Sequence, residues 1–505
     1  MKKKTRNLLK YIVLFFALYF SICTCLYFFE PVEYISPDLS KYQYYFDLYS
    51  KYEKSKNENF YIKQISPDDI CTFDNDKRIK YISNTIIAIA NNNYNFNDMS
   101  SLLKKYNGNI CGYIDKVNFY QISFNENKSY NELLELCDNL ISSEYFLSAI
   151  PDYFEETPVS EKHTDVEEYP TANYYKLLNI YKAWTLPDKF SKTNIGIIDY
   201  FVYDNDLINV ANIDEYDNNE LLKNVFSENI SASHGTHVAG IIGASANSNI
   251  TGVVKNANIY SYNGINVATS YWIANICDMI INKNIKAVNI SMAYNSYITI
   301  SASLNGENAI DYIKSEQSLF TDVLSNLIDG GYEFVICTAA GNSGKDSLYR
   351  VFNSYFEYGN KKYLSKIDIF GFFDSKPEYV DSKYSFFISD SNNKDVRNRI
   401  IVVGAIDNDS RYLAYSNSGE CVDIAATGKN IYSTSFDNNF EYRSGTSMST
   451  PFVTGTVGVI FSINSDLTGA EVKNIIINSA ENSVEHNGFS SPILNVGNAI
   501  ENTIR

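Results

Sequence analysis

The chain has 505 residues, of which 45% are hydrophobic and 20% charged, so it has an ordinary globular composition and is long enough for two or more domains. Its 59 acidic residues outnumber its 42 basic residues and give a net charge of −17, which argues against nucleic acid as a partner. Eight cysteines and four histidines match no zinc spacing. The sequence leaves open whether the cysteines pair as disulfides or stay as free thiols.

The first segment, residues 1–30, predicts a membrane signal. Five basic side chains precede an uncharged run from Tyr11 to Phe29, which has about the length that crosses a bilayer as a helix. No small-residue cleavage site follows this run, and this favours an uncleaved transmembrane anchor over the alternative, a cleaved signal peptide. We expect a single-pass protein of the cell membrane with its remaining residues outside the cytoplasm.

A spacer over residues 31–79 is expected to lead into a small domain over residues 80–156. The predicted elements of that domain are a strand at Thr85–Ala90, a helix at Phe96–Tyr106, two strands within Ile110–Phe124, a helix at Tyr130–Glu144 and a strand at Tyr145–Asp152. This β-α-β-β-α-β order is typical of a two-layer α+β domain. Residues 157–173 are acidic, polar and interrupted by proline, as is typical of a cleavable linker.

The main domain is expected over residues 174–505. Its buried strands are predicted at Asn194–Asp199, Ala287–Met292, Phe334–Thr338 and Ile400–Ala405, with helices at about 447–463 and 468–480 and a closing strand near 493–496. Strands that are apolar on both faces predict an α/β fold with a mainly parallel sheet. Asp199 ends such a strand, and in these folds that end faces the crevice where sites form.

Two further segments carry side chains suited to acid–base chemistry and to charge stabilisation. His234 lies at the start of a predicted helix (SHGTHVAGII) with His237 one turn later. A metal site is one alternative for this pair, but no third ligand is evident, which favours His234 as a general base. Asn342 follows two alanines and a glycine after a strand, where its amide is either an exposed hydrogen-bond donor or a simple turn residue.

The segment Gly445–Pro451 (GTSMSTP) precedes the apolar run Phe452–Ile463, which predicts a helix with Ser447 near its start. Free N–H groups and the positive end of the helix dipole at that point suit an oxygen that must become an anion. The small residues around Ser447 let another backbone approach closely. A simple helix cap is the alternative interpretation of this motif alone.

Asp199, His234 and Ser447 follow the chain order of acid, base and nucleophile found in subtilisin. With their flanking motifs NIGIID, SHGTHVAGII and GTSMSTP, they resemble the subtilisin-like serine proteases, or subtilases. The resemblance implies a three-layer α/β domain that hydrolyses peptide bonds through an acyl-enzyme, with Asn342 and the Ser447 N–H as the oxyanion hole. It also implies that the substrate backbone binds as an added strand along Ser291, Met292, Ala293, Ala339, Ala340 and Gly341.

The small domain, which ends in YFLSAIPDY (145–153), resembles the propeptide of these proteases, and Leu177–Trp184 resembles the segment that opens their catalytic domain. The resemblance implies a zymogen whose propeptide assists folding and inhibits the enzyme until it is cut. We expect self-cleavage between about Asp152 and Tyr174. Because the anchor is fused to the propeptide, this cut would release the catalytic domain from the membrane.

Some positions depart from the family pattern. Tyr200 and Phe201 replace the small hydroxyl residue and glycine that usually follow the aspartate, and Ala293 replaces a glycine. These departures motivate an alternative, a weak or inactive pseudoprotease that binds peptides or partner proteins. A dedicated maturation protease for one secreted peptide is a third interpretation. Polar insertions are expected at about 294–319 and 344–397, on either side of the cleft.

No cofactor is required for the expected chemistry, but structural calcium is a further expectation. Asp206 and Asn247 lie in segments that resemble the family's calcium-binding loops, although hydrophilic turns have the same composition. The uncharged residues 339–341 predict a preference for polypeptide substrates with apolar or small side chains. A peptide-library profile dominated by Lys or Arg would contradict that preference.

Overall fold

The computed structural model describes residues 59–155, 172–212, 233–293, 307–344 and 393–504, apart from residues 75, 188, 189, 191, 204, 246–249 and 256. The predicted membrane segment and nearly all of the predicted linker lie outside these residues. Within the described part of the chain, no helix combines the length and the apolar character needed to cross a bilayer.

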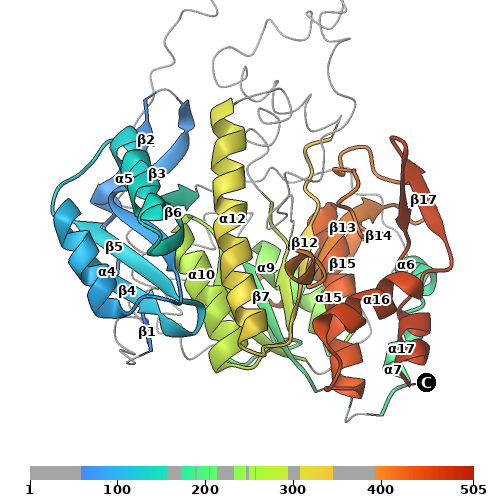
Figure 1. Cartoon of the computed structure of the whole chain (residues 1–505). Coiled ribbons are helices and arrows are strands. Elements are labelled where there is room, and N and C mark those ends of the chain that lie inside the picture. Colours follow the sequence, from blue (N-terminus) through green and yellow to red (C-terminus); the bar gives the residue numbers. More distant parts are fainter. Residues whose placement is uncertain are drawn as a thin grey trace, which may run out of the picture. The chain divides into compact units, whose positions relative to one another are not determined.

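The N-terminal domain is an antiparallel sheet in the order β4-β5-β3-β6 with two helices packed against it (Figure 1). Its elements are β3 (Asp76–Ala90), α4 (Phe96–Leu103), β4 (Gly108–Ile114), β5 (Phe119–Phe124), α5 (Tyr130–Ser142) and β6 (Phe146–Glu155). The β-α-β-β-α-β order is the predicted one. Both helices begin with a capping box, at Asn95 and at Ser129, which satisfies the free N–H groups of their first turns.

This sheet starts earlier in the chain than the sequence indicated. β1 (Phe60–Tyr61) pairs with β4, and β2 (Ile70–Phe73) pairs with β3, so residues assigned to the spacer belong to the sheet. β1 and β2 have only two and four residues, too few for a periodic pattern to show them.

The C-terminal domain is built on a seven-stranded parallel sheet in the order β14-β13-β12-β11-β7-β9-β8. The strands are β7 (Asn194–Asp199), β8 (Asn209–Val210), β9 (Asn258–Asn263), β11 (Ala287–Ile290), β12 (Val335–Ala339), β13 (Ile400–Ile406) and β14 (Ile424–Thr427). β7 lies at the point where the strand order changes direction. Because all strands run the same way, Asp199 and the ends of β11 and β12 meet at one edge of the sheet.

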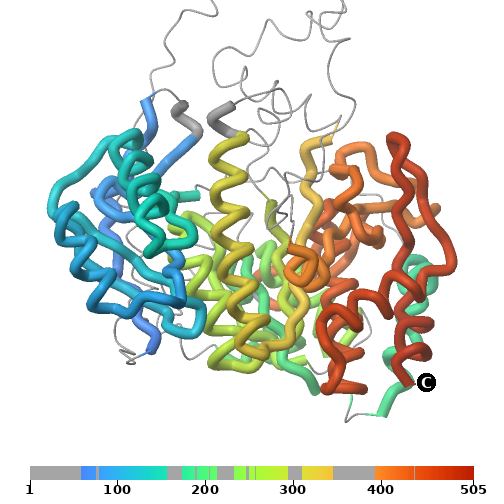
Figure 2. The backbone as a smooth tube through the Cα atoms, viewed as in Figure 1, coloured from blue at the N-terminus to red at the C-terminus, as the bar shows by residue number. Residues whose placement is uncertain are grey.

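Helices cover both faces of this sheet (Figures 1 and 2). α9 (His234–Gly243) contacts α15 (Thr446–Ile463), and α10 (Thr269–Cys277) contacts α12 (Glu307–Asp329). The right-handed crossovers expected between parallel strands put these two pairs on opposite faces of the sheet. α16 (Gly469–Asn478) also contacts α15. The predicted parallel α/β architecture in three layers is therefore confirmed.

Two predicted elements are wrong. Residues 493–496 form no strand beyond a single β-bridge of Ile493 with Ala425: a hairpin of β17 (Ser483–His486) and β18 (Phe489–Pro492) comes before them, and the last helix, α17, covers Val496–Ile504. Short apolar runs of this kind do not distinguish a strand from a helix. Residues 307–319, expected within a polar insertion, are the first half of α12, whose apolar residues lie on one face only.

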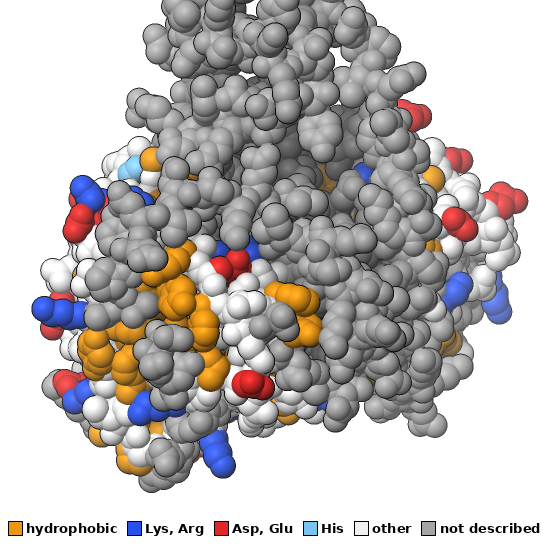
Figure 3. Space-filling view, turned by 180° about the vertical axis from the view of Figure 1, so that it is seen from behind, with side chains coloured by type: hydrophobic (Ala, Val, Ile, Leu, Met, Phe, Trp, Pro, Cys, Tyr) orange, Lys and Arg blue, Asp and Glu red, His pale blue; other side chains and the backbone are white. Residues whose placement is uncertain are grey.

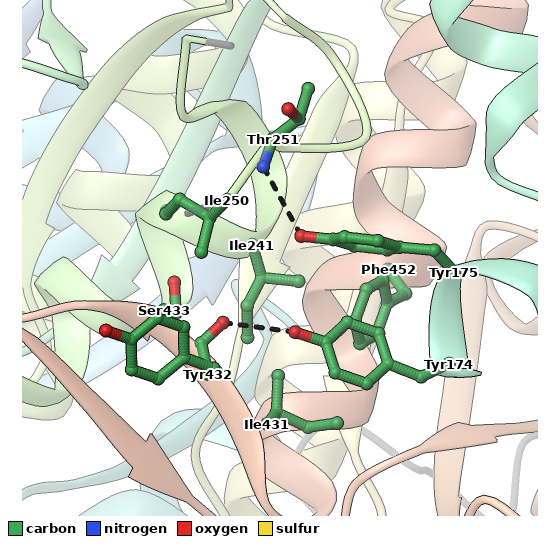
Figure 4. A pocket seen from close by; sticks show the side chains of 10 residues that line it. Tyr174, Tyr175, Ile241, Ile250, Thr251, Ile431, Tyr432, Ser433 and Phe452 are labelled. Atoms are coloured by element: carbon green, nitrogen blue, oxygen red, sulfur yellow. Dashed lines mark hydrogen bonds between the residues drawn. The ribbon is translucent and has the colours of Figure 1, made fainter. Parts of the chain in front are cut away.

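The first helix after the predicted linker, α6 (Ala172–Leu177), is held against the C-terminal domain by two tyrosines (Figure 4). The hydroxyl of Tyr174 donates to the carbonyl of Tyr432 at 3.3 Å, and the hydroxyl of Tyr175 accepts from the N–H of Thr251 at 3.3 Å. The ring of Tyr174 also packs on Phe452 of α15. These contacts hold the start of the domain independently of the residues before it.

The described part of the face in Figure 3 carries scattered Lys and Arg side chains that form no continuous basic patch. Hydrophobic side chains gather on one part of that face. The scattered basic side chains agree with the acidic net charge.

A buried ion cluster joins β13, β14 and α16. Asp423 accepts two hydrogen bonds of 2.9 Å from the guanidinium of Arg397 and forms an ion pair of 2.8 Å with Lys473, while its Oδ2 also accepts from the N–H of Val402. The side chains of Asp423 and Lys473 are only 10% and 8% exposed. Two cations therefore depend on one carboxylate for their neutralisation.

Asp423→Ala is expected to lower the free energy of unfolding by about 3–5 kcal/mol, because it leaves two largely buried cations without their partner. Lys182→Met, which removes the exposed ion pair between Lys182 and Glu501, is the matched control and should cost less than about 1 kcal/mol. Denaturant unfolding at constant pH measures both. Equal losses in the two variants would contradict the importance of the buried cluster.

Candidate active site

Asp199 and His234 are in direct contact. Asp199 is the last residue of β7 and is fully buried, and its Oδ1 lies 2.6 Å from Nδ1 of His234, the first residue of α9. A carboxylate can only accept, so Nδ1 carries the proton and Nε2 of the neutral ring is free to accept one. The side chain of His234 is 14% exposed, so this ring lies at the boundary between core and solvent.

The close approach of β7 and α9 depends on a glycine. A Cβ on Gly235 would overlap the carbonyl oxygen of Tyr200, so a larger residue would push the start of α9 away from the end of β7. The hydroxyl of Thr236 accepts the N–H of Tyr203 at 2.8 Å and ties the same two segments together. The Gly-Thr pair of the SHGTH motif therefore positions His234 against Asp199.

The carboxylate of Asp199 is only half satisfied. Its Oδ1 also accepts the N–H of Tyr200 at 2.7 Å, but its Oδ2 is buried without a hydrogen-bond partner among the described residues. In the family pattern a small hydroxyl residue usually follows the aspartate, and its hydroxyl would donate a hydrogen bond to this carboxylate. Tyr200 supplies only its backbone N–H, so the sequence departure has a direct structural consequence.

The start of α9 is held by charged residues that the sequence analysis did not identify. The hydroxyl of Ser233 donates to Glu441 at 2.6 Å and accepts from Arg443 at 2.6 Å, and Arg443 also donates to Glu441 at 2.8 Å. Glu441 and Arg443 lie on β16 (Phe440–Arg443). Burial alone would raise the pKa of Glu441, but Arg443 and the Ser233 hydroxyl outweigh it and lower the pKa to about 2.

His237, the second histidine of the motif, faces the core and does not join His234. Its Nε2 lies 3.0 Å from the carbonyl of Ile431 and 3.2 Å from that of Glu441. Burial, helped by the charge of Arg443, lowers the pKa of His237 to about 3, so the ring is neutral. No group of three or more His, Cys, Asp or Glu among the described residues could hold a metal ion, and a metal site on this histidine pair finds no support.

Ser447 is the second residue of α15, where the backbone N–H has no acceptor within the helix. Pro451, four residues later, has no N–H to bond the carbonyl of Ser447. That carbonyl instead accepts the hydroxyl of Ser291 at 2.9 Å, and the hydroxyl of Ser447 donates to the carbonyl of Ser291 at 2.9 Å. This reciprocal pair fixes the position of Ser447, and no hydrogen bond between Ser447 and His234 occurs within the described residues.

The side chain of Asn342 has one possible orientation. Its Oδ1 accepts the N–H of Thr446 at 2.9 Å and the hydroxyl of Thr446 at 3.1 Å, so its Nδ2 is the group left to donate. A Cβ built on Gly445 would lie 3.2 Å from Nδ2 of Asn342 and 3.7 Å from the N of Ser447. Both expected oxyanion donors therefore border the same space beside Gly445.

The predicted substrate-binding residues follow the ends of two neighbouring strands. Ser291, Met292 and Ala293 follow β11, whereas Ala339 ends β12 and Ala340 and Gly341 follow it. A Cβ on Gly341 would lie 3.4 Å from the Cβ of Ala293, so the two segments lie opposite each other. The structure thus brings all six predicted residues to the edge of the sheet that carries Asp199.

The last strand of the N-terminal domain extends into the C-terminal domain. β6 pairs antiparallel with β10 (Val267–Ala268), with Glu155 opposite Val267 and Phe154 opposite Ala268. The carboxylate of Asp152 accepts the N–H of Ser270 at 3.0 Å, in the first turn of α10. One continuous sheet therefore crosses from one domain to the other, and its strand β6 leads into residues 156–171.

Asp206, one of the two expected calcium ligands, is paired with Asn438. The carboxylate of Asp206 accepts from the side-chain amide of Asn438 at 3.1 Å, and Oδ1 of Asn438 accepts the N–H of Asp206 at 3.0 Å. This reciprocal pair uses one of the two carboxylate oxygens of Asp206, and the calcium expectation for Asp206 stays a prediction. Asn247 lies outside the described residues, so the calcium expectation for its loop stays a prediction.

Residues 83–493 match the sequence pattern of the Subtilase family. The chain belongs to the subtilase family. It is 26% identical over 235 residues to the thermophilic serine proteinase of Bacillus sp. strain AK1, covering 46% of this chain and 43% of that protein. It is 27% identical over 320 residues to subtilisin-like protease 1 of Plasmodium berghei, covering 59% of this chain and 46% of that protein. The matches thus cover less than half the length of these two relatives.

The fold of this subtilase resembles a solved structure of the epidermin leader peptide processing serine protease from Staphylococcus aureus. The TM-score is 0.50 at 17% identity, and the match covers 82% of this chain and 98% of that chain. At this identity the comparison supports the fold alone.

Proposed function

We propose that this subtilase is a serine endopeptidase that uses Asp199, His234 and Ser447 as its catalytic triad. The observation that carries the proposal is the contact of 2.6 Å between Asp199 and His234, which holds the imidazole in the tautomer of a general base. Ser447 lies at a helix N-terminus whose free N–H groups favour a developing negative charge. Polypeptides are the proposed substrates, bound along residues 291–293 and 339–341.

In the proposed reaction, the hydroxyl of Ser447 turns from the carbonyl of Ser291 to Nε2 of His234 when substrate binds. His234 takes the hydroxyl proton as Ser447 attacks the scissile carbonyl, and Asp199 stabilises the imidazolium that forms. Asn342 Nδ2 and the Ser447 N–H donate to the oxyanion. His234 then protonates the leaving amine, and water releases the acyl group from Ser447.

We propose further that the enzyme is made as a zymogen whose N-terminal domain is its own inhibitor. The pairing of β6 with β10 supports this, because it joins the end of the N-terminal domain to the domain that carries the triad. Cleavage between Asp152 and Tyr174 would leave α6 in place, since Tyr174 and Tyr175 hold it independently of the linker. We also propose that the basic and apolar N-terminus anchors the precursor in the cell membrane with the catalytic domain outside.

The alternative, a pseudoprotease that binds peptides in the same cleft, rests on Tyr200, Phe201 and the unpaired oxygen of Asp199. The intact contact between Asp199 and His234 and the fixed orientation of Asn342 favour catalysis instead.

A fluorophosphonate probe is expected to label the processed protein at Ser447, because the probe reacts with a serine that a general base activates. Mass spectrometry of the labelled peptide identifies the site. His234→Ala, cut between the two domains by an added protease so that it matches the processed wild type, should not be labelled although its fold stays intact. An unlabelled wild-type protein, or equal labelling of the two proteins, would favour the pseudoprotease.

A further inference from the structure

The loop that carries Asn342 leaves the sheet just before it reaches the site. The last ladder hydrogen bond of β12 runs from the N–H of Ala340 to the carbonyl of Val403 at 3.0 Å. Beyond that point the peptide groups of the loop no longer face a neighbouring strand, although buried peptide groups need partners. A side chain from another segment supplies hydrogen-bond partners for two of these peptide groups.

That side chain belongs to Asn417, which is 1% exposed. Its Nδ2 donates to the carbonyl of Ala340 at 2.8 Å, and its Oδ1 accepts the N–H of Ser343 at 2.9 Å. Its own N–H donates to the carbonyl of Gly341 at 2.9 Å. One residue therefore binds the backbone on both sides of Asn342.

The fit between Asn417 and the loop is close. Gly341 has φ +98°, a backbone conformation that glycine adopts readily, and a Cβ there would lie 2.6 Å from Nδ2 of Asn417. The carbonyl of Asn417 accepts the hydroxyl of Tyr412 at 2.8 Å, so the residue is itself held in place. Asn417 is rigid, and the loop has no room to shift toward it.

We propose that Asn417 is a positioning residue for the oxyanion hole, and the proposal rests on the function proposed above. Asn417 fixes the backbone of residues 340–343, while Thr446 fixes the side-chain oxygen of Asn342. Together they aim Nδ2 of Asn342 at the space beside Gly445. Asn417 does not touch the substrate and acts only through Asn342.

A double-mutant cycle in the processed enzyme tests this coupling. Asn342→Ala should lower kcat by about 10²- to 10³-fold, as expected for the loss of one oxyanion donor. Asn417→Ala should lower kcat by roughly 10- to 100-fold with KM unchanged, because a misplaced donor loses part of that effect. In the Asn342→Ala background, Asn417→Ala should change kcat by less than about threefold. If Asn417→Ala does not fold, Asn417→Ser goes through the same cycle, since its neutral side chain is too short to bond both the carbonyl of Ala340 and the N–H of Ser343.

Asn498→Ala is the matched control. The amide of Asn498 donates to the carbonyl of Ser479 at 3.3 Å and to Glu481 at 2.9 Å, in the same domain but on α17. This variant should lower the melting temperature without changing kcat. An equal effect of Asn417→Ala in both backgrounds would overturn the positioning role alone. An unchanged kcat in Asn342→Ala would overturn the oxyanion assignment and, with it, this inference.

Discussion

Ser447→Ala in the full-length chain is expected to lower kcat by on the order of 10⁶ and to leave the chain uncut between the two domains. Alanine cannot form the acyl-enzyme, and loss of the nucleophile has an effect of this size in subtilisin itself. The fold should survive, because the reciprocal pair keeps its bond from the Ser291 hydroxyl to the carbonyl of residue 447. Kinetics on a peptide substrate and N-terminal sequencing of the purified protein measure the two effects.

The control for processing is an inactive variant that keeps Ser447. His234→Ala should also stay uncut, whereas a mixture with active enzyme would show whether cleavage can occur between molecules. Wild-type protein should begin between Asp152 and Tyr174. If wild type and Ser447→Ala carry the same cut, an outside protease makes it, and self-processing is wrong.

Local patterns were sufficient to predict most of the fold. Continuous apolar runs marked β7, β11, β12 and β13, and hydrophobic periodicity marked α4 and α5 in the N-terminal domain. β1 and β2 were missed because they are short edge strands. α12 has a clear amphipathic pattern, but its first half lies in the stretch that was assigned to a polar insertion.

The site shows the same division between local and long-range information. Asp199, His234 and Ser447 could be predicted because each lies in a motif with its own local geometry. Asn417 and Glu441 could not, because their roles depend on partners that lie 74 to 208 positions away in the chain. The only local sign of Asn417 is a polar residue in a polar loop, and this is typical of ordinary turns.

The interface between the two domains buries carboxylates. Asp152 of β6 is fully buried, with one oxygen bonded to the N–H of Ser270 and the other without a partner in the described part of the chain. Glu316 of α12 is 1% exposed, and its Oε1 accepts the hydroxyl of Thr269. Glu155 of β6 accepts the hydroxyl of Tyr312 at 3.0 Å.

This arrangement makes the contact between the domains depend on pH. Burial raises the pKa of Asp152 from its usual 3.8 to about 7, and burial with the nearby charge of Glu316 raises the pKa of Glu155. Separation of the domains exposes Asp152 and restores an ordinary pKa. The paired state therefore holds more protons, and it loses stability as the pH rises from about 4 to about 7.

In the uncut Ser447→Ala chain, the free energy for opening the pairing of β6 with β10 is expected to fall by about 1.4 kcal/mol per pH unit between pH 5 and 7 for Asp152 alone. Asp152→Asn in this background should remove that slope, because the amide keeps an oxygen for the N–H of Ser270 but does not ionise. Hydrogen exchange of the β6 amides, corrected for the intrinsic pH dependence of exchange, measures the opening.

Asp138→Asn, at an exposed carboxylate on α5, is the control and should leave the slope unchanged. Parallel curves for Asp152→Asn and its parent would mean that Asp152 has the same protonation state before and after opening, so that it does not link the opening to pH. The expected result is that the N-terminal domain stays bound in mildly acidic conditions and separates near neutral pH. The carboxylates of β6 would then set the pH at which the proposed zymogen, once cut, becomes active.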